Sequence, residues 1–359
     1  MGKRKLQPDQ INRIVVRAPN WLGDVVMSVA ALRELRSVFP DSHITVATRA
    51  GSADVFMDAE FVDDVLVQDG SALRSVSQQI REWRQRKFDL ALLLQNAFQS
   101  AAVAFLARVP IRIGYQADRR GMLLTHAVPL PPWKNDRHEI YYYLNLVREV
   151  ERPAGDDAQT QSSDPDFTLH VSGERKRAAF ELLRQNGGRT DMPLVLLCPG
   201  SINSRAKRWP TDRYAALADL FSESGSQVAL IGSGAEAEIS RQVLTQTRHR
   251  PLVLTGRTSV LEIIAIIALA DILITNDTGP AHIGSAVGTP TLVIFGPTNP
   301  ATTRPFASTA EIIREPPDCA PCMLRDCPID HRCMTAIQPE QVFAQAWRML
   351  LRERAEVIA

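Results

Sequence analysis

Three turns of this chain carry residues that could act on a phosphate-bearing ligand. Asp24, Lys207 and the stretch from Thr275 to His282 each follow an apolar run that is typical of a buried strand. A carboxylate can take a proton from a hydroxyl group, and an ammonium group can neutralise a phosphate. At Asp277 the chain turns into a short helix, whose first backbone N–H groups and partial positive charge favour an anion. A nucleotide is the natural candidate.

The stretch from Thr275 to Pro300 is the most informative of these turns. Its pattern predicts a buried strand, a short helix and a second buried strand. Pro280 suits the first helical turn, and Gly288 marks the helix end. The helix start should therefore lie at the carboxyl edge of a parallel sheet, where α/β proteins bind their ligands.

Four residues of this helix start are candidates for donor binding. Thr278, Gly279 and His282 lie within one helical turn and can meet the same end of a ligand. Asp277 differs, because its charge disfavours contact with a phosphate. We expect it to cap the helix or to hold sugar hydroxyls. His282 could also be an ordinary core-facing or exposed helix residue.

Asp24 lies at the start of the first predicted helix, after the strand that begins near Arg13. One interpretation is a helix cap, which is a common role for Asp. The other is a general base that acts on a hydroxyl nucleophile, since a carboxylate there would repel a diphosphate. The turn lacks a GxGxxG fingerprint, which disfavours a dinucleotide-dependent dehydrogenase.

Lys207 lies in the polar loop from Cys198 to Pro210, between a predicted strand and a predicted helix. With Arg205 or Arg208 it could neutralise the charge of a departing diphosphate. The alternative is that all three cations are solvated on the surface. The loop occupies the same position in the second half as the turn of Asp24 in the first, so both interpretations stay open.

Further residues of the second half could contact the same ligand. Ser201 and Asn203 could donate hydrogen bonds to phosphates. The turn Gly232-Ser-Gly-Ala-Glu236 suits a close backbone approach, and Glu236 or Glu238 could accept a hydrogen bond from a ribose hydroxyl. A GxG sequence alone also occurs in ordinary tight turns.

The elements that must position these residues alternate between strand and helix in both halves. Strands are predicted at 13–17, 43–48, 64–67 and 88–94, and again at 194–198, 228–232, 252–255, 272–275 and 292–295. An apolar stripe predicts the first helix and comprises Val25, Val29, Leu32, Leu35 and Phe39. Residues 152–166 are rich in Pro, Gly, Ser and Asp and form the candidate linker. The class is α/β, with two doubly wound domains around a cleft.

We therefore expect an N-terminal domain over residues 1–165, including the linker, and a second domain over residues 166–338. The last helix, within 339–359, is expected to pack back on the first half. A length of 359 residues favours two domains over one.

Composition and charge argue against several classes of protein. The chain has 41 Lys and Arg against 40 Asp and Glu, which argues against a large nucleic-acid surface. Its apolar runs fall short of the roughly 18 residues that span a bilayer. The basic start, Met1 to Leu6, has no apolar segment after it and is expected to be a frayed tail. Five cysteines without a secretory signal favour the cytoplasm.

Four of the cysteines form a cluster with the spacing C-x2-C-x4-C-x5-C: Cys319, Cys322, Cys327 and Cys333. Four thiolates could hold a structural zinc ion, with His331 as an alternative ligand. The spacing is not that of a common zinc finger, and reduced thiols are the other interpretation. Cys198 lies on a predicted buried strand and is assigned to the core.

Taken together, the motifs of this chain resemble the ADP-heptose:lipopolysaccharide heptosyltransferases of glycosyltransferase family nine, most closely their type II subgroup. The resemblance spans nearly the whole chain. The motifs that carry it are PNWLGD at 19–24, RIGY at 112–115, PGS and AKRWP within 199–210, NDTGPAH at 276–282, and FGPTNP at 295–300. The four-cysteine segment also looks like the type II subgroup.

The resemblance implies a GT-B architecture of two Rossmann-like domains, with the acceptor held mainly by the first and the nucleotide sugar mainly by the second. It implies an inverting transfer of heptose from ADP-heptose to the lipid A-linked inner core. Asp24 matches the position of the catalytic base, and Lys207 that of the donor-phosphate lysine. Asp277, Thr278, Gly279 and His282 match the donor loop. We expect no cofactor and no divalent metal in catalysis, because Lys207 and helix N-termini can stabilise the departing ADP.

The implied acceptor carries phosphates and a lipid anchor, so we expect peripheral contact with the cytoplasmic face of the inner membrane. Basic residues that could meet the acceptor are Arg49, Arg112, Arg119, Arg120 and Arg137. Two other functions stay open: a transferase for another nucleotide sugar or a protein acceptor, and a non-catalytic protein that binds a partner.

Overall fold

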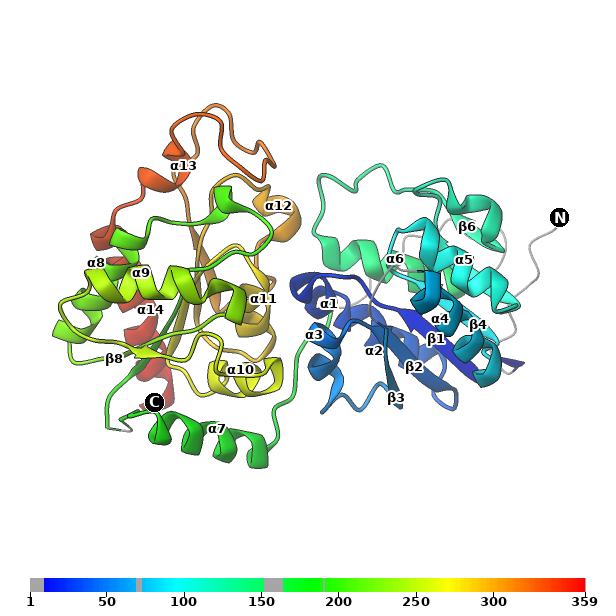
Figure 1. Cartoon of the computed structure of the whole chain (residues 1–359), viewed down its shortest axis with the longest axis horizontal. Coiled ribbons are helices and arrows are strands. Elements are labelled where there is room, and N and C mark those ends of the chain that lie inside the picture. Colours follow the sequence, from blue (N-terminus) through cyan, green and yellow to red (C-terminus); the bar gives the residue numbers. More distant parts are fainter. Residues whose placement is uncertain (1–9, 69–72, 152–163, 190, 359) are drawn as a thin grey trace. The chain divides into compact units, whose positions relative to one another are not determined.

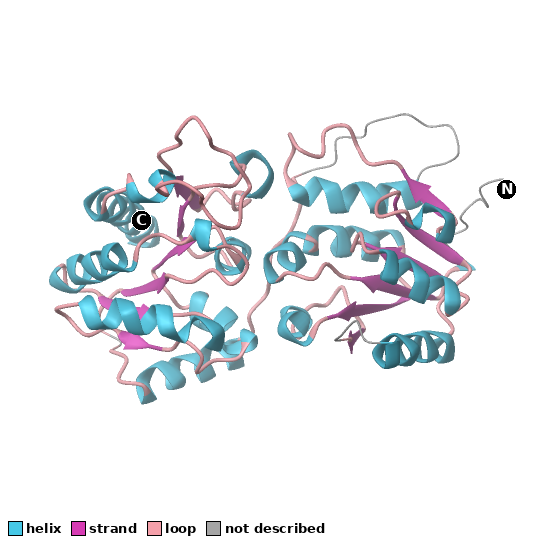
Figure 2. Cartoon of the chain, turned by 45° about the horizontal axis from the view of Figure 1, so that its top comes forward, coloured by secondary structure: helices cyan, strands magenta, loops and turns pink. Residues whose placement is uncertain are grey.

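The computed structural model describes residues 10–68, 73–151, 164–189 and 191–358. The chain divides into two units, Met1–Thr168 and Leu169–Ala359, each with a parallel six-stranded sheet and helices on both faces (Figures 1 and 2). The basic start, Met1 to Leu6, and residues 152–163 of the predicted linker lie outside the described residues.

The sheet of unit 1 has the strand order β3-β2-β1-β4-β5-β6, and all neighbouring strands are parallel. Its strands are β1 (Arg13–Arg17), β2 (His43–Thr48), β3 (Asp64–Val67), β4 (Leu90–Leu93), β5 (Ile111–Tyr115) and β6 (His126–Val128). The sequence predicted the first four and missed β5 and β6. The strand order reverses between β1 and β4, so the turn after β1 opens at a topological switch point.

The helical elements of unit 1 include α1 (Leu22–Met27), α2 (Val29–Val38), α3 (Ala50–Ala53), η2 (Asp54–Phe56), α4 (Leu73–Arg86), α5 (Phe98–Leu106), η3 (Arg120–Leu123) and α6 (Glu139–Glu151). The predicted first helix is in fact two, α1 and α2, which are separated at Ser28. The Ser28 hydroxyl donates to the carbonyl of Val25 at 2.7 Å and satisfies a group at the end of α1. The apolar stripe is nevertheless buried as expected.

The sheet of unit 2 has the order β12-β11-β10-β7-β8-β9, again with parallel neighbours. Its strands are β7 (Leu194–Cys198), β8 (Gln227–Leu230), β9 (Leu252–Val253), β10 (Ile272–Asn276), β11 (Thr291–Ile294) and β12 (Ala310–Ile313). Only β12 was not predicted. The order reverses between β7 and β10, so the loops that follow these two strands are neighbours at one edge of the sheet.

The helical elements of unit 2 include α7 (Gly173–Gln185), η4 (Arg205–Lys207), α8 (Thr211–Glu223), η5 (Gly234–Glu236), α9 (Ala237–Gln246), α10 (Val260–Ile267), α11 (Gly279–Ala286), α12 (Pro300–Thr303), α13 (Arg332–Thr335) and α14 (Pro339–Ile358). Helix α11 begins and ends close to its predicted bounds, and Gly288 follows it with a φ of 81°.

Helix α14 contributes to the hydrophobic core of unit 2. Its buried residues Val342, Ala346, Met349 and Leu350 belong to the hydrophobic core of unit 2. There the helix packs on α8 and β10, with Phe343 in an edge contact with Phe221 at 4.9 Å between ring centroids. These residues of α14 are thus buried within unit 2, and the packing of the helix on the first half stays a prediction.

Within the described part of the chain, no helix is both long and apolar enough to cross a bilayer.

Candidate functional site

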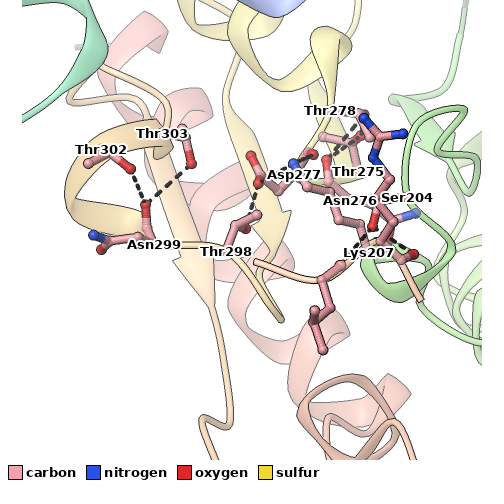
Figure 3. Close-up of polar contacts among 12 residues, drawn as sticks. Ser204, Lys207, Thr275, Asn276, Asp277, Thr278, Thr298, Asn299, Thr302 and Thr303 are labelled. Atoms are coloured by element: carbon pink, nitrogen blue, oxygen red, sulfur yellow. Dashed lines mark hydrogen bonds and ion pairs between the residues drawn. The ribbon is translucent and has the colours of Figure 1, made fainter. Parts of the chain in front are cut away.

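The site in unit 2 is built at the switch point between β7 and β10. The Lys207 ammonium group lies 2.8 Å from Asp277 Oδ2 and 3.1 Å from the carbonyl oxygen of the same residue. Thr298 donates its hydroxyl proton to the same Oδ2 at 2.6 Å (Figure 3). The side chain of Asp277 is 3% exposed and that of Lys207 is 26% exposed. A buried carboxylate thus holds a partly exposed cation at the carboxyl edge of the sheet.

Asn276 joins the loops around this ion pair. Its amide nitrogen donates to the carbonyls of Pro199 and Gly200, at 2.9 and 3.1 Å. Its amide oxygen accepts from the backbone N–H of Trp209 and from the Tyr214 hydroxyl, both at 3.1 Å. The side chain is fully buried and has all four of its hydrogen-bonding positions filled. Asn276 therefore fixes the PGS loop and the Lys207 loop relative to β10.

The start of α11 differs from the expectation in one respect. Asp277 does not cap the helix, because its carboxylate is bound by Lys207 and Thr298. The capping position is held by Thr278, whose side chain makes no capping hydrogen bond. Pro280 lies in the first turn, as predicted. The helix thus keeps the anion-favouring start that the sequence predicted.

His282 is buried, at 6% exposure, and lies inside α11. This burial fits the alternative of a core-facing helix residue better than that of an exposed one, and the contact of His282 with a donor stays a prediction. Gly279 is the first residue of the helix, next to Thr278.

The other cations of the Lys207 loop are engaged within unit 2. Arg208 donates from Nε and Nη2 to the carbonyl of Ser201, at 3.0 and 2.8 Å, and so closes the loop on itself. Arg205 forms an exposed ion pair with Asp326 at 2.6 Å. Asn203 is exposed in the same loop. Of the three cations, Lys207 is the one paired at the switch point.

Glu236 lies against the PGS loop. Its Oε2 accepts hydrogen bonds from the backbone N–H and the hydroxyl of Ser233, both at 2.8 Å. A Cβ on Gly200 would come within 2.0 Å of Glu236 Oε1, so only glycine leaves room for this carboxylate. Glu238 instead pairs with Arg241 on the exposed face of α9. Glu236 is therefore the better candidate for a ribose hydroxyl.

The cysteine segment is hydrogen-bonded to two loops of this site. His331 Nε2 lies 2.6 Å from the carbonyl of Ala206, and the N–H of Ala206 donates to the carbonyl of Arg325 at 2.9 Å. The N–H of Met323 donates to the carbonyl of Pro297 at 2.9 Å. The segment therefore holds both the Lys207 loop and the loop that carries Thr298.

The structure gives the predicted zinc site no support. Among the described residues, no three or more His, Cys, Asp or Glu side chains are grouped so that they could hold a metal ion. The four cysteines of the segment are free thiols, of which Cys319 is exposed and Cys333 is buried. Burial raises the pKa of Cys333 to about 11, and the neighbouring thiols add to the shift.

In unit 1, Asp24 lies in the first turn of α1, after β1, at the carboxyl edge of the sheet. The Tyr143 hydroxyl on α6 is hydrogen-bonded to Asp24. Burial and the charge of Asp24 raise the pKa of Tyr143 well above its ordinary value, so this hydroxyl keeps its proton and can donate it. A half-buried carboxylate with an oriented hydrogen-bond donor is suited to the role of a base.

Arg120 was a candidate for acceptor contact, and the structure corrects that assignment. Its side chain is fully buried and donates hydrogen bonds only to groups of its own unit. The acceptors are the carbonyls of Leu93, Gln95 and Tyr115, the hydroxyl of Ser100 and the side-chain oxygen of Asn96. Burial lowers the pKa of Arg120 to about 10. Arg120 therefore organises the carboxyl ends of β4 and β5.

Arg112 is also placed differently from the expectation. It lies near the amino end of β5, and its guanidinium group donates to the carbonyls of Val109 and Leu123. This is the sheet edge opposite to Asp24. The remaining basic candidates are all exposed. Arg49 follows β2, Arg119 precedes η3, and Arg137 lies over the ring of Tyr141 at 3.8 Å.

The sequence did not single out three residues that the structure places in the site: Asn276, Thr298 and Tyr143. Asn276 belongs to the NDTGPAH motif and Thr298 to the FGPTNP motif. Polar residues that follow an apolar strand so closely could have been recognised in the sequence as candidates for the site. Tyr143 lies in the helical run Tyr141-Tyr-Tyr143, and the run does not reveal which ring faces Asp24.

Comparisons with known proteins identify relatives of this chain. The sequence pattern of glycosyltransferase family 9 (heptosyltransferase) matches residues 76–332. Lipopolysaccharide heptosyltransferase 2 of Escherichia coli strain K12 is 28% identical over 96% of this chain and 100% of its own length. The enzyme of the same name from Salmonella typhimurium is 29% identical over 84% of this chain and 88% of its own length.

The solved structures agree with the fold. ADP-heptose LPS heptosyltransferase II of E. coli has a TM-score of 0.80 at 26% identity, and the match covers 95% of this chain and 99% of that one. A family 9 glycosyltransferase from Veillonella parvula has a TM-score of 0.84 at 24% identity, over 98% of this chain and 100% of that one. The α/β fold is therefore the GT-B type, and the chain belongs to glycosyltransferase family 9, the heptosyltransferases.

Proposed function

We propose that this protein transfers L-glycero-D-manno-heptose from ADP-heptose to the heptosyl-Kdo2-lipid A inner core of lipopolysaccharide. The relatives that match most of the chain are named for this kind of reaction. The observation that carries the proposal is the Lys207–Asp277 pair beside the start of α11, at the switch point of unit 2. This arrangement presents a fixed cation and the positive end of a helix to an anion, as a nucleoside diphosphate requires.

On this proposal unit 2 holds the donor. Lys207 and the first turn of α11, with Thr278 and Gly279, contact the diphosphate. Glu236 accepts a hydrogen bond from a ribose hydroxyl, and Ser201 and Asn203 line the phosphate side of the PGS loop. Asp277 supports Lys207 through the 2.8 Å ion pair, because its buried carboxylate is already bound twice.

Asp24 is assigned to the acceptor. As an acceptor hydroxyl attacks the anomeric carbon, its proton becomes acidic and passes to the Asp24 carboxylate. The bond from the anomeric carbon to the diphosphate oxygen breaks, and its electron pair leaves with ADP. Lys207 and the helix N–H groups offset the charge that develops on ADP. The single displacement inverts the anomeric configuration, and proton transfer of this kind contributes about 10²–10⁴ in rate.

The acceptor is anchored in a membrane, so we also propose that the protein works at the cytoplasmic face of the inner membrane as a peripheral protein. Basic residues, including Arg49, Arg119 and Arg137, would contact the phosphates of the acceptor or of lipids. The exposed position of all three is compatible with this role.

The test is to incubate purified protein with heptosyl-Kdo2-lipid A and either ADP-heptose or a UDP-sugar, and to follow nucleoside diphosphate release and acceptor mass. We expect one heptose to be added per acceptor with ADP-heptose alone. Transfer from a UDP-sugar at an equal rate would replace the proposed donor. Absence of transfer from any nucleotide sugar would favour a partner-binding protein.

A further inference from the structure

The short helix α5 in unit 1 has an unusual distribution of apolar side chains. Its buried face carries small residues, Ser100, Ala101, Val103 and Ala104. Its large apolar residues, Phe98, Phe105 and Leu106, are exposed to solvent instead. The spacing of seven residues places both phenylalanines on one side of the helix. The helix FQSAAVAFL contains no charged residue, and its polar residue Gln99 is half-exposed.

A neighbouring element extends this apolar face. The turn η3 packs on α5, and it presents Met122 with 83% of its surface exposed. We define the α5 face as the four exposed side chains Phe98, Phe105, Leu106 and Met122. Scattered exposed apolar residues are normal on proteins, but a group of large ones on adjacent elements marks an interaction surface.

Arginines surround the α5 face. The Arg112 guanidinium group lies 5.5 Å from the centroid of the Phe105 ring, and Arg84 donates to the carbonyl of Leu106. Arg108 is exposed just after Leu106, and Arg119 is exposed just before η3. An acid also lies at the edge of this set, namely Asp118, whose carboxylate accepts from the N–H of Phe98 at 2.8 Å. The rim is thus predominantly basic.

We infer that the α5 face docks unit 1 on a bilayer that contains anionic phospholipids. Apolar side chains that enter the headgroup boundary, ringed by arginines, suit such a surface, because the two attractions act together. The identity of this partner rests on the proposed function, since an acceptor anchored in a bilayer must be reached at its surface. Arg119, first considered for contact with the acceptor, then faces lipid phosphates.

The geometry relates the face to the site. In a parallel sheet the connecting helices run opposite to the strands, so α5 begins near the sheet edge where Asp24 lies. Phe98 is the first residue of α5, and Phe105 and Leu106 end it near the opposite edge. A bilayer that lies along α5 therefore keeps the carboxyl edge of this sheet, where Asp24 lies, close to the membrane surface.

The test uses the full chain and vesicles of phosphatidylethanolamine with phosphatidylglycerol, compared with phosphatidylcholine alone. The variant Phe105→Gln/Leu106→Gln/Met122→Gln removes the apolar side chains. Its matched control, Phe180→Gln/Ile329→Gln, removes exposed apolar side chains of unit 2. Arg108→Glu tests the basic rim. Circular dichroism and a denaturation curve check that each variant is folded.

We expect the parent and the control to sediment with anionic vesicles, and the triple variant to bind at least tenfold more weakly. Arg108→Glu should weaken binding to anionic vesicles several-fold, and salt should have the same effect. Transfer to a deacylated, water-soluble acceptor should be unchanged in the triple variant, while transfer to lipid-anchored acceptor in vesicles should fall.

Equal vesicle binding by the parent and the triple variant, or no binding by the parent, would overturn the inference. So would light scattering that shows a dimer of the parent which the triple variant dissociates, because a second copy would then cover the α5 face. Loss of the proposed function has a different signature, since a protein that transfers nothing to the soluble acceptor can still bind vesicles through α5.

Discussion

Lys207 and Asp277 form an ion pair in which the carboxylate is buried and the ammonium group is partly exposed, with 2.8 Å between Nζ and Oδ2. The pair joins the loop after β7 to the loop after β10, and Thr298 binds the same carboxylate oxygen from the loop after β11. Three loops of the sheet edge thus meet at one carboxylate, whose role is to hold a cation in place.

Replacement of Lys207 by Ala should lower kcat about 10²–10³-fold, as expected for loss of a group that stabilises charge on a leaving diphosphate. Thr298→Val keeps the shape of the side chain and removes its hydroxyl. It should cost about 1 kcal/mol, or roughly fivefold in kcat/KM, through a less well-held Lys207. Steady-state kinetics with ADP-heptose measures both. A Lys207→Ala enzyme with parental kcat would show that this cation does not act on the leaving group.

Asn276→Asp should destabilise the protein by about 2–4 kcal/mol. The substitution removes two buried donor hydrogen bonds and places a carboxylate against the carbonyls of Pro199 and Gly200. Urea denaturation followed by circular dichroism measures the change. Asn299→Asp is the matched control, because Asn299 caps α12 through its side-chain oxygen and Asp caps equally well. Equal stability of the two variants would contradict the role of Asn276 as a hub.

Tyr143→Phe should lower kcat severalfold and move the acid limb of the kcat/KM profile toward higher pH. The raised pKa of Tyr143 keeps its hydroxyl protonated across the working range. It can therefore donate to the ionised form of Asp24, and without this bond the carboxylate is protonated more easily. Rates measured between pH 5 and 9, at about unit intervals, give the profile. Tyr141→Phe on the same helix is the control. An unchanged acid limb would refute a positioning role for Tyr143.

Arg120→Lys should destabilise unit 1 by about 2–3 kcal/mol, although the charge is kept. A lysine cannot reproduce the planar set of donors that Arg120 offers to the carbonyls of Gln95 and Tyr115 and to Asn96. Thermal unfolding measures the loss, with Arg119→Lys as the exposed neighbouring control. A stable Arg120→Lys protein with weakened acceptor binding would restore the original assignment of Arg120 to the acceptor.

The parts of the fold that follow from local pattern were predictable. Apolar runs such as Leu194–Cys198 and Ile272–Asn276 are buried on both faces of a parallel sheet, so their composition predicts them. The missed strands have mixed burial: β5 and β6 include half-buried residues, and β12 is half-buried throughout. A half-buried edge strand carries a weaker apolar signal.

The sequence indicates which turns form the site, because the carboxyl ends of parallel strands meet at one edge of the sheet. The partners of individual side chains were not. Whether Asp277 caps a helix or binds Lys207 depends on the place of β7 beside β10, which is a long-range property. The burial of Arg120 likewise depends on β4 and β5 being neighbours. The packing of α14 in the core of unit 2 was not predicted either, because an amphipathic pattern shows that a helix packs and not on what it packs.

The central claim is that Asp24 takes the proton while unit 2 holds the donor, and one measurement tests it most directly. Purified parent and Asp24→Asn proteins are compared in transfer from ADP-heptose to heptosyl-Kdo2-lipid A, with ADP-heptose binding measured by calorimetry in parallel. We predict that Asp24→Asn binds ADP-heptose like the parent and transfers heptose about 10²–10⁴-fold more slowly. Transfer by Asp24→Asn at the parental rate would contradict the account.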